Sequence, residues 1–187
     1  RLCTPYSVIS RELDRPSWYL CVDVENQLLL ERHLIDESHQ VLNSMYFSDL
    51  QLGQAVNVAQ ANSSSAYESW LQETPERVSV QPLKTGWRFR FPDGFEVVSS
   101  SQLQTGTDPQ IIQMVLSDGL SVFSIFIQKL NEQEKLFTLD QQMFMQETLM
   151  YAHRVDDYVV MATGVMPMQT LKEVAMSATF IPPVVTQ

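Results

Sequence analysis

Positive charge and glycine are both scarce in this sequence of 187 residues. Lys and Arg total 12 against 22 Asp and Glu, so the formal net charge is -10 at pH 7. Proteins that bind nucleic acid through its phosphates need the opposite balance, and we therefore exclude nucleic-acid binding. The chain has only six Gly, and the glycine-rich loops that cradle nucleotide phosphates are missing.

Long apolar runs and familiar catalytic motifs are missing as well. No apolar stretch approaches the roughly 18 residues of a membrane span, so we predict no transmembrane segment. The chain contains no Gly-x-Ser-x-Gly elbow and no His-Glu-x-x-His motif. The pair Asp156-Asp157 falls in a predicted turn, where aspartate is favoured for local hydrogen bonding. We predict no catalytic residue and no cofactor, and a hydrolase with an unrecognised site remains the alternative from the enzyme class.

Potential metal ligands are few. His33, Asp36 and His39 flank one predicted turn and could approach a single ion. No Cys and no third His lies nearby in the sequence, so chance spacing explains them better. We predict no metal site.

The two cysteines leave two interpretations open. Cys3 and Cys21 lie on strands that we expect to be neighbours, so they are candidates for a disulfide in an oxidising compartment. A turn centred on Glu12-Leu13 places Cys3 opposite Val22 and turns the two thiols to opposite faces, whereas a shift of one residue aligns them. The alternative is that one or both thiols are buried as small apolar groups.

The residues that are present are typical of a globular protein, with 44% apolar and 10% aromatic side chains. In the first seventy residues, short apolar stretches alternate with turn residues, which predicts strands at 7–10, 17–24, 28–35 and 41–50. The connections are short, so neighbouring strands should be antiparallel. The chain starts at Arg1 without an initiating Met, and we expect a fragment or a processed product.

One face of the predicted strand at 17–24 is apolar. Side chains of this face recur with a period of two, which is the pattern of a strand with one face against apolar groups. Packing in a core is the alternative to a ligand-lining role. The apolar set is Trp18, Leu20, Val22 and Val24, joined by Leu28 and Leu30 from the next strand.

Residues 72–86, with Pro75 and Pro82, predict a linker. Ser65 and Glu68 form a capping box for a short helix before it. Four cations in and after the linker have no acidic residue between them, which makes this stretch locally positive. A solvated surface is the alternative explanation. The four are Arg77, Lys84, Arg88 and Arg90.

The second half predicts further strands and one helix. The predicted strands cover 96–100, 111–116, 120–128, 149–155 and 158–165. Asp118-Gly119 and Asp156-Asp157 are the expected hairpin turns. Thr170 is the expected cap of a helix over 171–179. Its buried stripe follows helical spacing and comprises Leu171, Val174, Ala175 and Ala178.

The strand after Asp118-Gly119 has two apolar faces. Phe123, Ile125 and Ile127 lie on one face, whereas Val122 and Phe126 lie on the other. A sheet with one covered face buries only one of these sets. The leftover face, with Val122 and Phe126, is a candidate partner surface. A second structural layer over it is the alternative.

Four collinear pieces of the chain resemble the RseB/MucB family. The first piece is 1–3, and the second runs from 22–25 to 28–32. The third combines Trp87 and 91–95 with 117–120, Phe123 and Ser124, and the last is 163–167 before Thr170. Together these pieces cover essentially the whole chain in order.

The resemblance implies an α+β protein of two parts. Residues 1–71 would be the second half of a LolA-like domain, an antiparallel half-barrel sheet whose first half precedes Arg1. Residues 72–86 would be the linker, and residues 87–187 a small antiparallel sheet with a C-terminal helix.

The resemblance also implies a function. Family members are periplasmic negative regulators of the sigma-E envelope stress response. They bind the periplasmic segment of a membrane-anchored anti-sigma factor, shield it from proteolysis and sense lipid or lipopolysaccharide. The alternative within the binding class is a lipid or lipoprotein carrier of the LolA kind.

This resemblance assigns expected roles to the residues singled out above. Partner binding is expected at Val122 and Phe126, with Trp87 and Phe95 from the family motif. Acyl chains are expected against the Trp18 face, and phosphates near the four cations from Arg77 to Arg90. Half of a curved sheet leaves an open strand edge, so a homo-oligomer is also expected.

Overall fold

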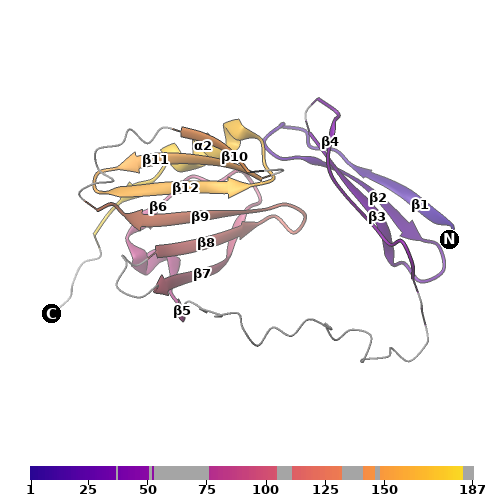
Figure 1. Cartoon of the computed structure of the whole chain (residues 1–187), viewed down its shortest axis with the longest axis horizontal. Helices are drawn as coiled ribbons and strands as arrows, with labels where there is room; N and C mark the ends of the chain where they lie inside the picture. The colour runs from indigo at the N-terminus through magenta and orange to yellow at the C-terminus, as the bar shows by residue number, and fades with distance from the viewer. Residues whose placement is uncertain are drawn as a thin grey trace, which may run out of the picture.

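The computed structural model describes residues 1–36, 38–50, 52, 76–104, 111–131, 141–145 and 148–182. In this part of the chain, antiparallel strands form a four-stranded, a seven-stranded and a two-stranded sheet, accompanied by one α-helix. Figure 1 shows the four-stranded sheet beside the larger one. The predicted α+β class is confirmed. The short helix predicted near 65–71 lies outside the described residues.

The first sheet is a meander in chain order. Its strands are β1 (Cys3–Val8), β2 (Ser17–Asp23), β3 (Leu29–Ile35) and β4 (Val41–Tyr46). All neighbouring pairs are antiparallel, as the short connections predict. β1 starts at Cys3 instead of residue 7, because it pairs along nearly the whole of β2.

The second sheet has the order β10-β11-β12-β9-β8-β7-β5. All its neighbours are antiparallel. Its strands are β5 (Glu76–Ser79), β7 (Glu96–Gln104), β8 (Ile111–Ser117), β9 (Val122–Lys129), β10 (Gln141–Met145), β11 (Thr148–Val155) and β12 (Tyr158–Gly164).

The predicted linker contains regular structure in its second half. β5 pairs with β7 as the edge strand of the large sheet, and the 3-10 helix η2 (Pro82–Thr85) follows it. Pro82, one of the two prolines on which the linker prediction depends, begins η2, and Gly86 ends it in the left-handed region. Residues 76–85 therefore belong with the second sheet in space.

Both predicted hairpin turns are present in this sheet. Asp156-Asp157 is a two-residue turn between Val155 and Tyr158. The β8–β9 turn is longer than predicted, because Ser117 pairs with Val122 and leaves four residues in the loop. Gly119 has a φ of 92°, a conformation that favours glycine.

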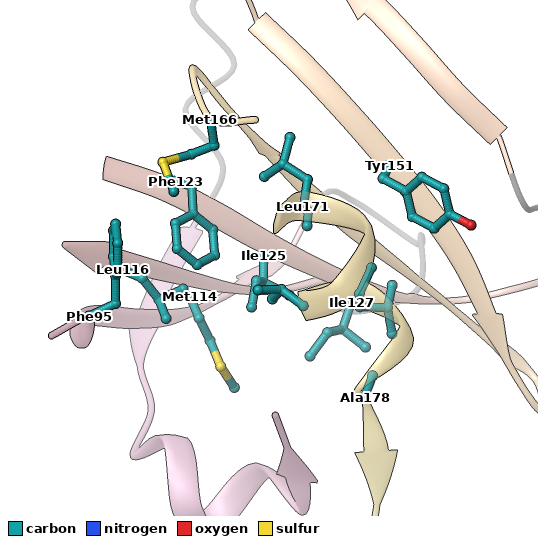
Figure 2. Close-up of a cluster of buried hydrophobic side chains, with 14 of the residues drawn as sticks. Phe95, Met114, Leu116, Phe123, Ile125, Ile127, Tyr151, Met166, Leu171 and Ala178 are labelled. Atoms are coloured by element: carbon teal, nitrogen blue, oxygen red, sulfur yellow. The ribbon is translucent and has the colours of Figure 1, made fainter. Parts of the chain in front are cut away.

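The helix α2 (Met168–Met176) packs against β11 and β12 and closes one face of the large sheet. Its buried residues include Leu171, Val174 and Ala175, as predicted, and Ala178 is buried just after its end. Figure 2 shows Leu171 close to the inward side chains of β9. Burying each large aliphatic side chain contributes roughly 1.5–3 kcal/mol.

The expected cap of this helix is wrong. α2 begins at Met168 with Pro167 at its N-cap, and no side chain caps it. Thr170 lies inside the first turn, and its hydroxyl donates instead to the Asp14 carbonyl oxygen, at 2.7 Å. The Thr170 hydroxyl thus joins α2 to the first part of the chain.

A short two-stranded sheet packs beside α2. It consists of β6 (Trp87–Arg88) and β13 (Thr179–Phe180). The Trp87 ring lies 5.1 Å from the Phe180 ring and 5.3 Å from the Tyr158 ring, measured between centroids. Among the described residues, no helix has the length and hydropathy that a membrane crossing requires.

Candidate functional site

The two faces of β9 differ in burial, as the alternation predicts. Phe123, Ile125 and Ile127 point into the core under α2 and are almost completely buried. On the opposite face Val122 is 53% exposed and Phe126 is half-buried. The leftover apolar face therefore exists, and its role in binding is taken up below as a proposal.

Neighbouring strands extend this outer face. Phe126 pairs with Met161 of β12 on one side and with Gln113 of β8 on the other. Ala152 and Val159 are buried in a separate small cluster with Leu130, and Met161 packs against it. Phe126 thus lies beside Met161, at the margin of this second apolar cluster.

Trp87 and Phe95 have a different environment. Trp87 is 3% exposed and Phe95 is 6% exposed, and both belong to the core cluster of the second sheet. Buried rings of this size stabilise a core and offer little surface to a partner. Of the four side chains expected to contact a partner, Val122 and Phe126 are therefore the accessible ones.

In the first sheet, Trp18 and Leu20 share a face, but the burial along β2 does not alternate cleanly. Trp18 is buried, Leu20 and Val22 are half-buried, and Val24 is exposed. Leu28 and Leu30, on the following segment, are half-buried. A register shift in the β2–β3 pairing between Cys21 and Val22 interrupts the simple period of two.

An arginine lies on this predominantly apolar face. Arg32 pairs with Leu20 in the β2–β3 ladder, and its guanidinium carbon lies 5.3 Å from the centre of the Trp18 ring. Such a cation–π contact stabilises the charged guanidinium of Arg32 beside the Trp18 ring. The buried Arg32 Nε has no hydrogen-bond partner among the described residues.

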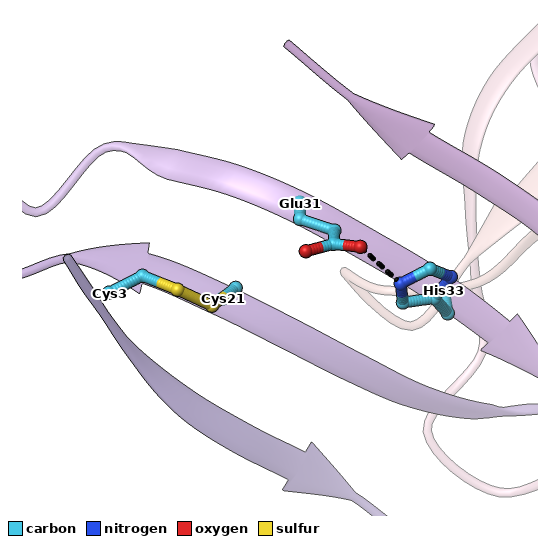
Figure 3. The surroundings of a disulfide bond; sticks show 4 residues. All are labelled: Cys3, Cys21, Glu31 and His33. Carbon is cyan, nitrogen blue, oxygen red and sulfur yellow. Dashed lines mark hydrogen bonds and ion pairs between the residues drawn. A yellow bond between two sulfur atoms is a disulfide. The ribbon is translucent and has the colours of Figure 1, made fainter. Parts of the chain in front are cut away.

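The disulfide between Cys3 and Cys21 is present, with Cα atoms 5.5 Å apart. Neither register considered from the sequence is the observed one, because Cys3 pairs with Asp23 and Cys21 pairs with Pro5. The two cysteines are therefore diagonal neighbours on the same face of the hairpin, within the range that a disulfide spans. Figure 3 shows the bridge between the two strands.

Polar contacts surround the disulfide. His33 Nε2 lies 2.7 Å from a Glu31 carboxylate oxygen (Figure 3). His33 Nδ1 lies 2.8 Å from the Ser44 hydroxyl. The Arg1 guanidinium pairs with Asp23, and this hydrogen bond lowers the pKa of the Asp23 carboxyl. His33 thus has polar partners on both ring nitrogens, and Asp36 and His39 do not join it in a cluster of metal ligands within the described residues.

The four predicted phosphate-binding cations lie on different elements. Arg77 is on β5, Lys84 is in η2 and Arg88 is on β6. Arg88 donates to the carbonyl oxygens of Leu83 and Trp87. Lys84 and Arg90 line two separate cavities, of about 490 and 800 Å³.

The contact between the two sheets centres on Arg15, in the β1–β2 loop. Its Nη1 donates to Asp118 Oδ2 at 2.8 Å, and its Nη2 donates to the Asp93 carbonyl oxygen at 2.6 Å. The guanidinium carbon also lies 4.9 Å from the centre of the Phe95 ring. Two further bonds to the Asp14 carboxylate fix its orientation. Arg15 thus links the β1–β2 loop with two loops of the second sheet.

Electrostatics at this junction favour the charged forms. The hydrogen bond from Arg15 holds the pKa of the Asp14 carboxyl below its usual value. Burial by itself raises the pKa of Asp118, but the N–H groups of Ser121 and Leu120 and the Arg15 guanidinium together lower it overall. Arg15 in turn has a raised pKa because it hydrogen-bonds to Asp14. All three groups are charged at neutral pH.

Sequence reasoning missed this junction. Arg15 and Asp118 are each in turns, and nothing in a sequence pattern pairs two turns that lie so far apart. The loop between the first two strands carries adjacent charges at Asp14 and Arg15, but this local pattern does not identify a partner. The signal for Arg32 is its spacing, because it follows Leu28 and Leu30 at intervals of two residues and so falls on the same predicted strand face.

Comparison with known proteins identifies the family. Residues 81–179, more than half of the chain, match the family model of the MucB/RseB C-terminal domain. The chain belongs to the MucB/RseB family. The region matched begins just after β5 and ends in β13, so it covers the β8–β9 turn and α2.

Relatives extend the similarity over nearly the whole chain. The sigma-E factor regulatory protein RseB of Escherichia coli strain K12 is 27% identical over 186 residues, and that of Salmonella typhimurium is 26% identical. Each alignment covers 96% of this chain and 55% of the relative. The chain therefore spans about half the length of these relatives.

Solved structures share the fold. A crystal structure of MucB in complex with MucA(peri) matches with a TM-score of 0.75 and 23% identity, over 97% of this chain and 63% of that one. The Pseudomonas aeruginosa MucA/MucB complex matches with a TM-score of 0.74 and 24% identity, over 97% and 60% of the two chains. The arrangement of both sheets is thus a family feature.

Proposed function

We propose that this chain is part of a periplasmic regulator that binds the periplasmic segment of an anti-sigma factor and shields it from proteolysis. Membership in the MucB/RseB family supports this proposal, as do relatives named for sigma-E regulation and the MucB complex with MucA(peri). The observation that carries it is the accessible apolar face of β9, where Val122 and Phe126 lie outside the core.

The apolar side chains on the outer face of β9 are more typical of a surface that binds a partner than of one exposed to solvent. Exposed apolar side chains that are grouped, and not scattered singly, are typical of interaction sites. Phe126 beside Met161 combines an aromatic ring with a flexible thioether, and both types are enriched at interfaces. Trp87 and Phe95 are buried in the core cluster of this sheet, so the proposal gives the direct contact to Val122 and Phe126.

A matched pair of substitutions tests the proposal. Phe126→Ala should weaken binding to the purified anti-sigma periplasmic domain by about tenfold or more, since an aromatic anchor commonly contributes over 1 kcal/mol. Val98→Ala is the control, because Val98 is an exposed apolar residue on β7 instead of β9. Calorimetric titration measures the affinities, and thermal unfolding checks that both variants remain folded. A large loss of stability for Phe126→Ala with unchanged affinity would make Phe126 a core residue and refute the proposal.

We further propose that the Trp18 face of the first sheet senses lipid. The half-buried Leu20, Val22, Leu28 and Leu30 offer apolar contact for acyl chains, with Val24 at the exposed end. Arg32, within this face, supplies a cation for a phosphate or carboxylate group, which the sequence had assigned only to Arg77, Lys84, Arg88 and Arg90. An anionic lipid requires both a cation for its head group and an apolar surface for its acyl chains.

Lipid binding has its own test. Lipopolysaccharide binding should weaken when Leu20→Asp introduces charge on the apolar face, and should weaken only modestly with added salt, because screening spares burial. Loss of all binding at moderate salt would show that attraction is purely electrostatic. Lipid binding without any anti-sigma binding would favour the alternative, a carrier of the LolA kind. The expectation that the strand at 17–24 forms an open edge is wrong, because β2 pairs with β1 on one side and with β3 on the other. Formation of a homo-oligomer stays a prediction, which light scattering tests.

A further inference from the structure

Three exposed apolar side chains gather where η2, β6 and β13 meet. Leu83 is 75% exposed, Ile181 is 57% exposed and Phe180 is 38% exposed. Backbone contacts hold their segments together. Leu83 is in η2, which Gly86 ends, and the Ile181 N–H donates to the Gly86 carbonyl oxygen at 2.8 Å. Phe180 pairs with Trp87 in the β6–β13 ladder. Exposed apolar side chains grouped in this way are typical of an interaction surface.

Two cations lie within this group. Lys84 directly follows Leu83 in η2, and the Arg88 guanidinium donates to the Leu83 carbonyl oxygen at 3.4 Å. Neither cation forms a salt bridge with an acidic residue in the part of the chain that the structure describes. We call this surface the η2 corner, and it comprises Leu83, Lys84, Arg88, Phe180 and Ile181.

The η2 corner is positive although the chain as a whole is acidic. The formal net charge of the chain is -10, yet residues 77–92 and 174–182 contain no Asp or Glu. These two ranges include the whole corner. A locally positive surface on an acidic protein orients the molecule toward an anionic surface, because the rest of the molecule is repelled by it.

The β11–β12 turn brings two carboxylates toward the corner, since the Tyr158 ring lies 5.9 Å from the Phe180 ring. Cations lie at the same turn. Lys129 pairs with Tyr158 in the β9–β12 ladder, and the Arg154 guanidinium donates to the Asp156 carbonyl oxygen. These two cations offset the charges of Asp156-Asp157, so the η2 corner keeps its net positive charge.

We infer that the η2 corner docks on a membrane surface that contains anionic phospholipid. Leu83 and Ile181 enter the boundary of the acyl chains, and Lys84 and Arg88 contact phosphate groups. Apolar insertion together with cations at the head groups is how peripheral proteins hold to an anionic bilayer. A side chain that is 75% exposed projects from the surface, which suits insertion into a lipid layer better than contact with a peptide groove.

This surface is separate from those of the proposed function. The Trp18 face is in the first sheet and takes the acyl chains of a bound lipid, and the outer face of β9 takes the anti-sigma segment. The η2 corner is formed by η2, β6 and β13 instead. It would place the regulator at a bilayer, so the inference goes beyond the proposed function and can fail without it.

Co-sedimentation of the full chain with vesicles tests the inference. The chain should bind phosphatidylglycerol vesicles, and should bind phosphatidylcholine vesicles about tenfold more weakly, because the cations then lack anionic partners. Leu83→Asp should weaken binding to phosphatidylglycerol about tenfold or more, and Lys84→Gln about fivefold. Both side chains are exposed, so the unfolding temperatures should not change. Leu13→Asp is the matched control, because Leu13 is a 62% exposed leucine in the β1–β2 loop and should not affect vesicle binding.

Several results would overturn the inference. Equal binding of Leu83→Asp and the unaltered chain would remove the corner from the contact, and equal binding to both lipids would remove the role of its cations. Vesicle binding lost in Leu20→Asp and kept in Leu83→Asp would assign the membrane to the Trp18 face. Release from vesicles by inorganic phosphate, at an ionic strength where chloride has no effect, would assign the cations to a soluble anion.

The purified anti-sigma periplasmic domain gives the last comparison. Leu83→Asp should bind this domain with unchanged affinity, because the proposed contact is on β9. A loss of this affinity in a chain that binds no vesicles would assign the η2 corner to the protein partner and overturn the inference. Failure of the unaltered chain to bind the domain, with vesicle binding as expected, would refute the proposed function alone.

Discussion

Arg15 and Asp118 form an ion pair of 2.8 Å between Nη1 and Oδ2, although 103 positions separate them in the chain. Both side chains are largely buried, so water screens this pair less than a surface salt bridge. The same guanidinium also bonds the Asp93 carbonyl oxygen. The guanidinium also contacts the Phe95 ring, so Arg15 alone makes three contacts between the β1–β2 loop and the second part of the chain.

Replacing Arg15 should loosen this junction. Arg15→Ala removes the ion pair and leaves the buried Asp118 carboxylate with one partner fewer, which should destabilise the docked arrangement by roughly 1–3 kcal/mol. Hydrogen exchange at residues 93–95 and 118–121 should accelerate. Arg11→Ala, an exposed residue of the same loop, is the control and should leave exchange unchanged. Unchanged exchange in both variants would contradict the role assigned to Arg15.

The junction should also weaken in acid. Asp14 and Asp118 both have lowered pKa values in the folded protein. Their stabilisation is therefore complete above the ordinary aspartate value of about 3.9 and is lost as the pH falls through the lowered pKa values. Urea unfolding between pH 2 and 7 measures this dependence. Asp118→Asn should flatten the acid limb of the curve, and an identical slope in the variant would exclude Asp118 as a contributor.

The disulfide should stabilise the first sheet. Cys3 and Cys21 close a loop with a sequence separation of 18, for which the chain-entropy estimate is about 3 kcal/mol. Cys3→Ser with Cys21→Ser should lower the free energy of unfolding by about this amount. Reductant should have the same effect on the unaltered chain and none on the double variant. Two free thiols found in the native, oxidised protein would contradict the bridge.

Gly164 should resist substitution even by alanine. A Cβ at this position would lie 2.8 Å from Phe123 Cβ and 3.1 Å from Phe123 Cα, and neither atom can move without displacing β9. Gly164→Ala should therefore cost about 1–3 kcal/mol of stability, as overpacking does. Gly119→Ala gives the contrast: nothing lies within 4 Å of its Cβ, so only the backbone strain at φ 92° opposes it. Equal melting temperatures for Gly164→Ala and the unaltered chain would show that the strands can separate.

The sequence pattern correctly predicted the strands and the helix stripe that depend on residues close together in the chain. The β2–β3 and β11–β12 pairs follow from short turns, and the two faces of β9 follow from a period of two. The stripe of Leu171, Val174 and Ala175 follows from helical spacing, because α2 buries one side against the sheet. In these places local preference and tertiary packing agree.

Elsewhere tertiary contacts override the local signal. Thr170 has the right chemistry for an N-cap, yet its hydroxyl serves the Asp14 carbonyl oxygen, and Pro167 begins the helix. The Cys3–Cys21 register depends on how a loop of eight residues folds at its tip, and that tip is fixed by Arg15 and its distant partners. Trp87 is part of the family motif, and the motif alone does not say whether the ring is exposed. The ring is covered by Phe180 of β13, which is distant in the sequence.

The two oxygens of the Asp118 carboxylate serve separate tasks. Oδ1 accepts from the N–H groups of Leu120 and Ser121 and shapes the β8–β9 turn, whereas Oδ2 accepts from Arg15. Release of Arg15 therefore empties one oxygen and leaves the turn with both of its backbone bonds. The conformation of the β8–β9 turn therefore does not depend on the contact that joins it to the β1–β2 loop.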